Sequence, residues 1–315
     1  MTAWRRLGGF AALAACMGAF CSPYVEAGEG ASVVTTQVKL VSIYPHNTSA
    51  FTEGFLYLDG ALVESTGLAR HSVIREYRLQ DAVNMDTIST YEEDGDSQNG
   101  EDDDEDVEPS TKKGVVNEFH YDPEIFGEGI ASIGDKIYAL TYKHNKVLVL
   151  SRKTFKLLET HPFRTSTGEG WGMTTDDKYL IVSDGSSSIQ FFDPSQNFKR
   201  VRSIDVKENG NLVSKINELE YVDGEILANV WFENCVLRIN PEDGTVIERI
   251  DLSWIAGMVS NLDSMQDQHM REEAVMNGIA YDPASRHIFL TGKLWDSIFE
   301  VELSYLAKEH HKSDT

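Results

Sequence analysis

The sequence predicts an all-β protein, a five-bladed β-propeller, because one short pattern recurs five times along its 315 residues. Each copy has a polar or aromatic residue beside Gly or Leu, then an apolar stretch, a tight turn and a second apolar stretch. One small sheet cannot bury both of its faces, so this repeat indicates blades that cover one another. The copies open at Thr52-Glu53-Gly54-Phe55, Gly127-Glu128-Gly129-Ile130, Gly170-Trp171-Gly172-Met173, Asn217-Glu218-Leu219-Glu220 and Met276-Asn277-Gly278-Ile279.

Two further strands of each blade follow from the same repeat. A β-like run comes after each opening and its turn, at residues 61–63, 136–138, 179–181, 225–227 and 287–289. Outer strands are expected at residues 146–150, 188–192, 235–239 and 297–301, several of them followed by turn residues. In a propeller the innermost strands begin around the central channel. Residues 53, 128, 171, 218 and 277 are therefore expected around one axis.

The spacing of the openings predicts where the blades carry insertions. Successive openings are 75, 43, 47 and 59 residues apart, so two intervals hold extra chain. The first insertion is acidic, at about residues 92–113, and is expected to be a disordered loop, because like charges at this density repel one another. A calcium-binding role for it lacks the Gly-bearing spacing of an organised calcium loop. The second insertion, residues 255–275, ends in a charged stretch that predicts a short helix.

The last blade is one strand short within its own repeat. The segment 38–44, Val-Lys-Leu-Val-Ser-Ile-Tyr, is a spare β-like run that precedes the first blade. Pairing it with the last blade would close the ring and remove two exposed strand edges. The propeller is therefore assigned to residues 38–307, after a linker at 28–37 and before a polar tail at 308–315.

The N-terminus predicts a secretory signal peptide over residues 1–27. Arg5 and Arg6 precede an apolar run that ends at Cys21, and Val25-Glu26-Ala27 supplies small residues for cleavage. The expected location is the secretory pathway, either extracellular or lumenal, and an uncleaved leader acting as a membrane anchor is the alternative. The mature chain would then keep one cysteine, Cys235, and one glycosylation sequon, at Asn47.

The charge of the chain excludes one class of partner. The formal net charge is −23, and eleven of the acidic residues lie between residues 92 and 108. Nucleic-acid binding is not expected, because phosphate contacts need clustered Lys and Arg. The nine His residues are scattered and form no zinc-binding motif, so no metal and no cofactor are expected.

The motifs of the repeat resemble those of the plant and bacterial type of glutaminyl cyclase, the glutaminyl-peptide cyclotransferases. The resemblance runs from about Tyr44 to about Leu303, with one or more motifs in each blade. The motifs are Ala50-Phe51-Thr52-Glu53-Gly54, Glu64-Ser65-Thr66-Gly67-Leu68, Phe126-Gly127-Glu128-Gly129, Gly170-Trp171-Gly172, Ser183-Asp184-Gly185, Asn217-Glu218-Leu219-Glu220-Tyr221, Ala228-Asn229-Val230-Trp231 and Thr291-Gly292-Lys293-Leu294-Trp295.

The resemblance implies a five-bladed propeller that converts the N-terminal glutamine of peptides or proteins to pyroglutamate and releases ammonia. A monomer is expected. Glu128 falls on the family's catalytic glutamate. The implied aromatic lining is Phe51, Phe126, Trp171 and Trp231, and the implied polar contacts are Asn217 and Lys293. Plant enzymes have Gln where this chain has Glu53, and Trp where it has Tyr142. Tyr142 keeps an aromatic wall, whereas Glu53 adds a second carboxyl group, which we count with the catalytic residues.

The reaction explains these residue types. The α-amine attacks the side-chain amide carbon, and one carboxyl group can take the proton of the amine and return one to the leaving ammonia. Aromatic walls exclude water and orient the side chain, while a Lys and an Asn can stabilise charge on the amide oxygen. Glycines beside Glu53 and Glu128 also suit a crowded propeller axis, which is a purely structural alternative. Lys293 follows Gly292 in an apolar strand and needs a carboxylate or a substrate nearby.

Two other functions remain open at this stage. A calcium-dependent hydrolase of the lactonase kind would use the oxygen-bearing side chains that the repeat places near the axis. These side chains are Glu53, Glu128, Asn217, Glu218 and Asn277. A propeller that binds peptides without turnover is the non-enzymatic alternative, in which Glu53 has disabled catalysis.

Overall fold

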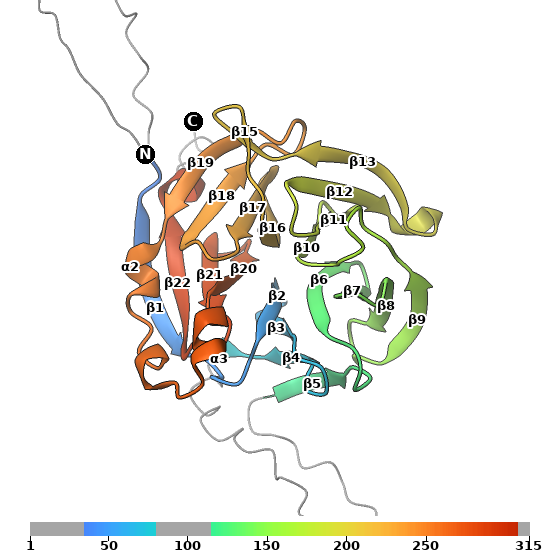
Figure 1. Cartoon of the computed structure of the whole chain (residues 1–315), viewed down its shortest axis with the longest axis horizontal. Helices are drawn as coiled ribbons and strands as arrows, with labels where there is room; N and C mark the ends of the chain where they lie inside the picture. Colours follow the sequence, from blue (N-terminus) through green and yellow to red (C-terminus); the bar gives the residue numbers. More distant parts are fainter. Residues whose placement is uncertain (1–34, 80–114, 308–315) are drawn as a thin grey trace, which may run out of the picture. The chain divides into compact units, whose positions relative to one another are not determined.

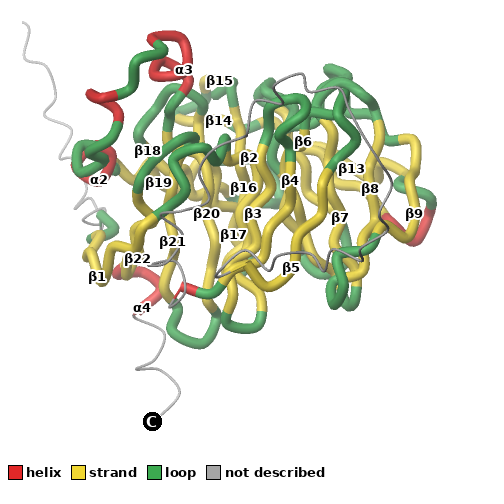
Figure 2. Tube along the Cα trace, turned by 90° about the horizontal axis from the view of Figure 1, so that it is seen from below, coloured by secondary structure: helices red, strands yellow, loops and turns green. Residues whose placement is uncertain are grey.

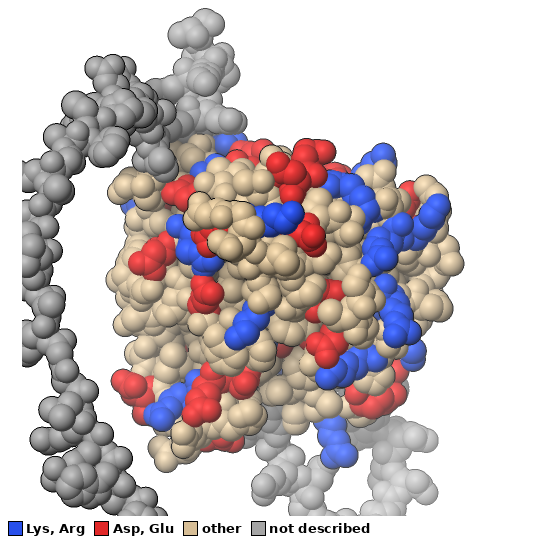
Figure 3. All heavy atoms as spheres, turned by 45° about the horizontal axis from the view of Figure 1, so that its top comes forward, with Lys and Arg blue, Asp and Glu red and all other residues tan. Residues whose placement is uncertain are grey.

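Five four-stranded antiparallel sheets lie around one axis in the computed structural model, which describes residues 35–79 and 115–307 (Figure 1). This arrangement confirms the five-bladed β-propeller. The predicted signal peptide, the acidic insertion and the C-terminal tail lie outside the described residues. On the face seen in Figure 3, acidic and basic side chains are interspersed.

Blades 1 to 4 each run from an inner strand outward in chain order. Blade 1 contains β2 (Thr52–Leu58), β3 (Ala61–Thr66), β4 (Val73–Tyr77) and β5 (Val115–His120). Blade 2 contains β6 (Gly127–Ile133), β7 (Lys136–Thr141), β8 (Lys146–Ser151) and β9 (Leu157–Pro162). Blade 3 contains β10 (Met173–Thr175), β11 (Leu180–Ser183), β12 (Ser188–Asp193) and β13 (Lys199–Asp205). Blade 4 contains β16 (Ile216–Val222), β17 (Glu225–Val230), β18 (Cys235–Ile239) and β19 (Val246–Asp251).

Blade 5 joins the two ends of the described chain. Its sheet order is β1-β22-β21-β20, built from β20 (Met276–Asp282), β21 (His287–Gly292), β22 (Ser297–Leu303) and β1 (Val38–Pro45). β1 pairs antiparallel with β22 from Val38 opposite Leu303 to Pro45 opposite Ser297. The predicted ring closure by an N-terminal strand is therefore confirmed.

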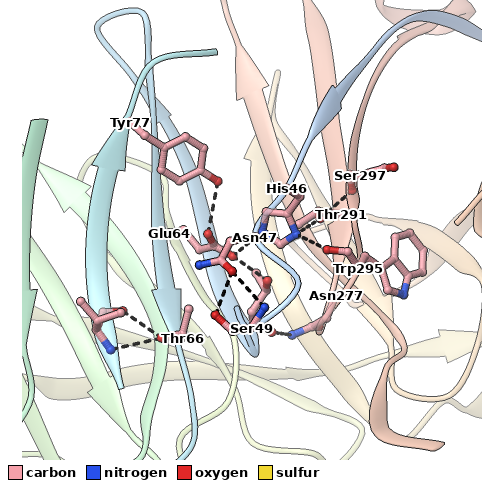
Figure 4. Close-up of polar contacts among 12 residues, drawn as sticks. His46, Asn47, Ser49, Glu64, Thr66, Tyr77, Asn277, Thr291, Trp295 and Ser297 are labelled. Atoms are coloured by element: carbon pink, nitrogen blue, oxygen red, sulfur yellow. Dashed lines mark hydrogen bonds and ion pairs between the residues drawn. The ribbon is translucent and has the colours of Figure 1, made fainter. Parts of the chain in front are cut away.

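A buried polar network fixes this closure to the neighbouring blade (Figure 4). His46 follows β1, and its ring bonds the Glu64 carboxylate on β3 and the main-chain oxygen of Trp295, each at 2.9 Å. Thr52 and Tyr77 also donate to Glu64. Burial alone opposes both charges, but the net pKa of His46 is raised and that of Glu64 is lowered because each stabilises the other. A satisfied ion pair thus joins blade 1 to blade 5.

The hydrophobic core consists of clusters between neighbouring blades. Phe55 and Leu62 of blade 1, for example, pack with Phe289 and Ile298 of blade 5, and four more clusters fill the other blade interfaces. Cys235 lies in the cluster between blades 3 and 4 and is a free thiol. Every sheet therefore buries both faces, as the repeat requires.

Bulges interrupt the inner strands where they approach the axis. The pairing of β6 with β7, for example, shifts by one residue between Gly127 and Ile130, and β2, β16 and β20 show the same shift. A bulge re-aims the side chains beside it. In the strand registers, Ile130, Leu219 and Ile279 are the first paired residues after the bulge and are therefore equivalent. Counting back from these positions, the residues equivalent to Glu128 are Glu53, Trp171, Asn217 and Asn277. The expectation that placed Glu218 in this set was wrong by one residue.

Glu218 instead occupies the position that is glycine in the other four blades, namely Gly54, Gly129, Gly172 and Gly278. Those glycines permit close approach between blades, since a Cβ at Gly172 would lie 2.1 Å from the Asn217 main-chain oxygen. In blade 4 the Glu218 side chain extends across the axis and accepts hydrogen bonds from Phe55 N and Ile279 N. It therefore ties blade 4 to blades 1 and 5.

The insertions carry the short elements outside the blades. β14 (Lys207–Glu208) and β15 (Asn211–Leu212) form a hairpin between blades 3 and 4, and η1 (Pro194–Gln196) precedes β13. The predicted helical insertion contains α2 (Ser253–Ala256), η2 (Leu262–Ser264) and α3 (Gln268–Glu273), and α4 (Ser304–Ala307) follows β22. Among the described residues, no helix has the length and apolarity that a membrane span needs. Figure 2 shows α3 and the β14–β15 hairpin on the same face of the ring.

Replacing Gly172 with Ala should lower the free energy of unfolding by about 2 kcal/mol or more, because main-chain atoms of blade 4 occupy the space that the methyl group needs. Chemical denaturation followed by intrinsic fluorescence measures this change. Gly257→Ala is the matched control, since its Cβ would meet only ordinary contacts at 3.4 Å or more. Equal stability of the two variants would contradict the close approach.

Candidate active site at the channel mouth

The functional side chains lie at one end of every blade. The inner strand and the second strand of each blade form an antiparallel hairpin, so the start of the inner strand lies beside the end of the second strand. Residues at the start of the inner strand therefore lie beside residues that directly follow the second strand. Phe51, Glu53, Phe126, Glu128, Trp171 and Asn217 precede or begin inner strands, whereas Leu68, Tyr142, Trp231 and Lys293 follow second strands. The repeat therefore collects them at a single mouth of the channel.

These residues enclose a cavity of about 260 Å³. All nine residues predicted from the sequence line it, together with Leu68, His269, Met270 and Glu273. A larger hollow of about 490 Å³ lies beside the surface ion pair of Asp59 and Arg152, and none of the nine residues lines it. The cavity at the mouth, with its convergent charged groups and aromatic walls, is the candidate active site.

Lys293 and Glu53 form a buried ion pair inside this cavity. The Lys293 Nζ donates to Glu53 Oε1 at 2.7 Å, and both side chains are almost fully buried. Asn277 Nδ2 donates to the other oxygen of Glu53 at 3.3 Å and to the main-chain oxygen of Thr52 at 2.9 Å. The sequence required a carboxylate or a substrate beside Lys293, and Glu53 supplies the carboxylate. Desolvation nevertheless raises the pKa of Glu53 to about 7, against the opposing effect of Lys293.

Glu128 is the second carboxyl group, and it is buried without a cation of its own. Among the described residues its carboxyl group has no hydrogen-bond partner, whereas its side chain faces the cavity. Burial, and then the neighbouring charge of Glu53, raises the pKa of Glu128 well above its ordinary value. The two carboxyl groups therefore influence one another, and ionising either one disfavours ionising the other.

Five aromatic rings line the cavity. Phe126 contacts Phe51 edge to face at a centroid distance of 6.1 Å and Tyr142 at 5.6 Å. Trp171 and Trp231 meet edge to face at 5.4 Å. The Trp171 indole is oriented by its hydrogen bond to Glu169, and the Lys293 ammonium lies 4.5 Å from the centre of the Phe51 ring. Such walls lower the local dielectric constant and strengthen the charge interactions inside.

The helical insertion supplies residues that sequence reasoning missed. α3 contributes His269, Met270 and Glu273 to the cavity wall. Met270 also packs with Phe51 and Leu294 in a small hydrophobic cluster that holds the insertion against the mouth. The length of the interval between blades 4 and 5 signalled an insertion, but only tertiary packing determines which of its side chains reach the cavity.

The oxygen-bearing groups proposed for a calcium site are not assembled as one set. Glu53, Glu128 and Asn217 line the cavity, whereas both oxygens of Glu218 accept main-chain N–H groups. Asn277 directs its amide nitrogen at Glu53 and Thr52. Across residues 35–79 and 115–307, no cluster of three His, Cys, Asp or Glu side chains could hold a metal ion.

Asn47 has a geometry that bears on its predicted glycosylation. Its Oδ1 accepts hydrogen bonds from the main-chain nitrogen and the hydroxyl group of Ser49, as Figure 4 shows. Its Nδ2, the atom that would carry a glycan, is buried and has no partner among the described residues. A glycan on this nitrogen needs the loop to move outward, and the modification stays a prediction.

Comparisons with known proteins identify the family of the chain. A family model described as glutamine cyclotransferase matches residues 11–303. The chain is 31% identical over 268 residues to a glutaminyl-peptide cyclotransferase of Arabidopsis thaliana, covering 85% of this chain and 71% of that protein. The crystal structure of Myxococcus xanthus glutaminyl cyclase superposes with a TM-score of 0.67 at 32% identity, covering 84% of this chain and 96% of the other. The chain belongs to the glutamine cyclotransferase family.

Proposed function

We propose that this protein converts the N-terminal glutamine of peptides or proteins to pyroglutamate with release of ammonia, using Glu128 as the proton-transfer group. The observation that carries the proposal is the unpaired Glu128 carboxyl group, buried in an aromatic cavity with a raised pKa. General acid–base groups work best when their pKa lies near the working pH. Burial raises the pKa of this carboxyl group from its ordinary value toward that range.

The reaction needs one proton to move between two nitrogens. The α-amine attacks the side-chain amide carbon, so that one N–C bond forms, and Glu128 in its ionised form takes the proton that the amine loses. The same carboxyl group then returns this proton to the amide nitrogen as its C–N bond breaks and ammonia leaves. Because the pKa of Glu128 is raised, it lies closer to the pKa of an α-ammonium group, which is about 8. Transfer of the proton from the amine to Glu128 is therefore less costly.

In this mechanism Lys293 and Asn217 support the amide oxygen during the reaction. An ammonium group has three N–H donors, and Glu53 uses one of those on Lys293, so others remain for a ligand. Donors fixed before the reaction stabilise the charge that develops on the oxygen of the tetrahedral intermediate. Asn217 holds the position equivalent to Glu128 in blade 4 and adds an amide group to the same cavity.

Carboxylates at the rim favour a cationic substrate end. Glu273 on α3 lines the cavity and raises the pKa of Glu53 through its charge, and Glu169 acts on Glu128 in the same way. An α-ammonium group entering this region meets an excess of negative charge. A neutral glutamine side chain suits the aromatic walls beyond, which exclude water and hold it folded toward the amine.

A direct assay separates this proposal from the two alternatives. Purified protein is incubated separately with a peptide that begins with Gln and with the N-acetylated form of that peptide. The masses of the products are measured by mass spectrometry. The proposal expects loss of ammonia from the free peptide alone, with full activity after chelator treatment. Abolition by the chelator would favour the calcium-dependent hydrolase, and binding without ammonia release would favour a non-catalytic peptide-binding propeller.

Glu128→Gln should keep the fold and lower kcat by about 10²–10⁴-fold, because an amide keeps the shape of the side chain but cannot carry the proton. Steady-state kinetics on a Gln-initiated peptide measures the loss. Glu242→Gln, in an exposed turn after β18, is the matched control and should behave as wild type. Retention of more than half of the wild-type kcat would remove Glu128 from the mechanism.

Glu53→Gln should leave an active enzyme. In its profile of kcat/KM against pH, the fall in activity on the acidic side should occur at lower pH than in wild type. The charge of Glu53 raises the pKa of Glu128, and removing it also frees Lys293 to stabilise ionised Glu128. Both effects lower the pKa of Glu128, so its base form persists to lower pH, by roughly one unit. An unchanged kcat/KM profile would show that the groups do not interact, and complete inactivity would place the proton-transfer group at residue 53.

A further inference from the structure

A second groove adjoins the candidate active site and shares one wall with it. Trp231 lines both the cavity and this groove, which has a volume of about 590 Å³. Its other walls come from Leu212 of the β14–β15 hairpin, Lys215 just before β16, Phe232 in the turn after β17 and Arg249 on β19. The hairpin lies on the same face of the ring as α3, which borders the cavity.

The hairpin is a well-defined wall. Asn209 and Gly210 form its turn with φ values of 50° and 82°, the Asn-Gly combination that suits the twist of a two-residue hairpin loop. The main-chain nitrogen of Lys207 donates to Gly244, and that of Val213 donates to Val206. Main-chain hydrogen bonds therefore hold both strands of the hairpin, which forms one wall of the groove.

Lys215 gives the groove a cation that is available to a ligand. Arg249, the other cation in the wall, is held by Glu208 at 2.8 Å and also by Glu233. Lys215 is exposed, and within residues 35–79 and 115–307 it has no carboxylate partner. Its ammonium lies 5.8 Å from the centre of the Trp231 ring and 5.2 Å from that of Phe232. A carboxylate in the groove would find this charge beside two aromatic faces.

Phe232 combines a strained backbone conformation with an exposed side chain. The residue two places after the second strand has a positive φ in blades 1, 4 and 5, at Leu68, Phe232 and Leu294. A large side chain in this region is strained. Leu68 and Leu294 offset the strain by packing in the cluster that holds the helical insertion, whereas Phe232 is 49% exposed. Leu212 on the hairpin is 61% exposed.

We propose that this groove is a subsite for the residues that follow the N-terminal glutamine of the substrate, and that it favours apolar and acidic side chains there. The inference rests on the proposed function. A glutamine held in the cavity must let the rest of its peptide leave through the mouth, and the groove lies beside the cavity, with Trp231 as the wall that they share. Phe232 and Leu212 would cover apolar side chains, and Lys215 would pair with a carboxylate.

The test compares a long and a short substrate. The long peptide is Gln followed by alternating Leu and Glu over four residues, which samples the possible registers, and the short one is Gln-Ala amide. We expect Phe232→Asn, which tolerates positive φ, to lower the long-to-short ratio of kcat/KM roughly tenfold, mainly through KM. Lys215→Glu should lower the same ratio. For a second long peptide, in which Lys replaces Glu, this variant should raise the ratio. Leu158→Ser, at an exposed position on β9, is the control and should leave the ratio unchanged.

Equal ratios in wild type and in the two groove variants would overturn the subsite. Failure of the proposed function is a separate result, because wild type would then cyclise neither peptide. In that case calorimetric binding of the long peptide decides the question. Weaker binding by Phe232→Asn and Lys215→Glu than by wild type supports the groove, whereas equal binding, or none to wild type, refutes it.

Discussion

The convergence of five inner strands on one axis is the constraint on which the rest of this structure depends. Main chains approach so closely there that blades 1, 2 and 3 need glycine next to the axis position, and Gly278 of blade 5 has a positive φ of 128°. In four blades a bulge accompanies this approach and re-aims the side chains beside it. In blade 4 Glu218 replaces the glycine, and its carboxylate accepts hydrogen bonds from main-chain amides of blades 1 and 5. The same crowding that closes the ring therefore creates a buried polar centre.

That centre holds more carboxyl groups than cations. Lys293 is paired with Glu53, and Glu128, which has no ion-pair partner among the described residues, is influenced by the charges of both Glu53 and Lys293. Burying ionisable groups in this way does not favour stability, because a carboxyl group whose pKa is raised on folding destabilises the fold as pH rises through that value. The proton transfer that we propose for Glu128 would account for this arrangement, whereas a role in folding would not. The satisfied His46–Glu64 pair, by contrast, joins two blades and lies outside the cavity.

Much of the architecture could be predicted from the sequence. The repeat fixed the number of blades, and the spare segment before the first blade predicted the strand that closes the ring, because an unpaired edge in the last blade needs a partner. The repeat predicted that Glu53, Glu128 and Trp171 lie near the axis, whereas the other candidate cavity residues came from the resemblance to the glutaminyl cyclases. The one-residue error at Glu218 arose because Asn217-Glu218-Leu219 resembles the Glu-Gly motifs, and the bulge that sets the register leaves no local sequence signal. The residues of α3 were missed because their position depends on packing against Phe51 and Leu294, which lie far away in the sequence.

The coupling of the two buried carboxyl groups can be measured most directly by NMR titration of protein carrying ¹³C at the side-chain carboxyl carbon of glutamate. Spectra of Glu53→Gln and Glu128→Gln assign the two signals. We expect both groups to titrate above the ordinary value of 4.5, and replacement of Glu53 to lower the pKa of Glu128. If both groups instead titrate near 4.5, or if Glu128 is unaffected by the loss of Glu53, the proposed proton-transfer site is contradicted.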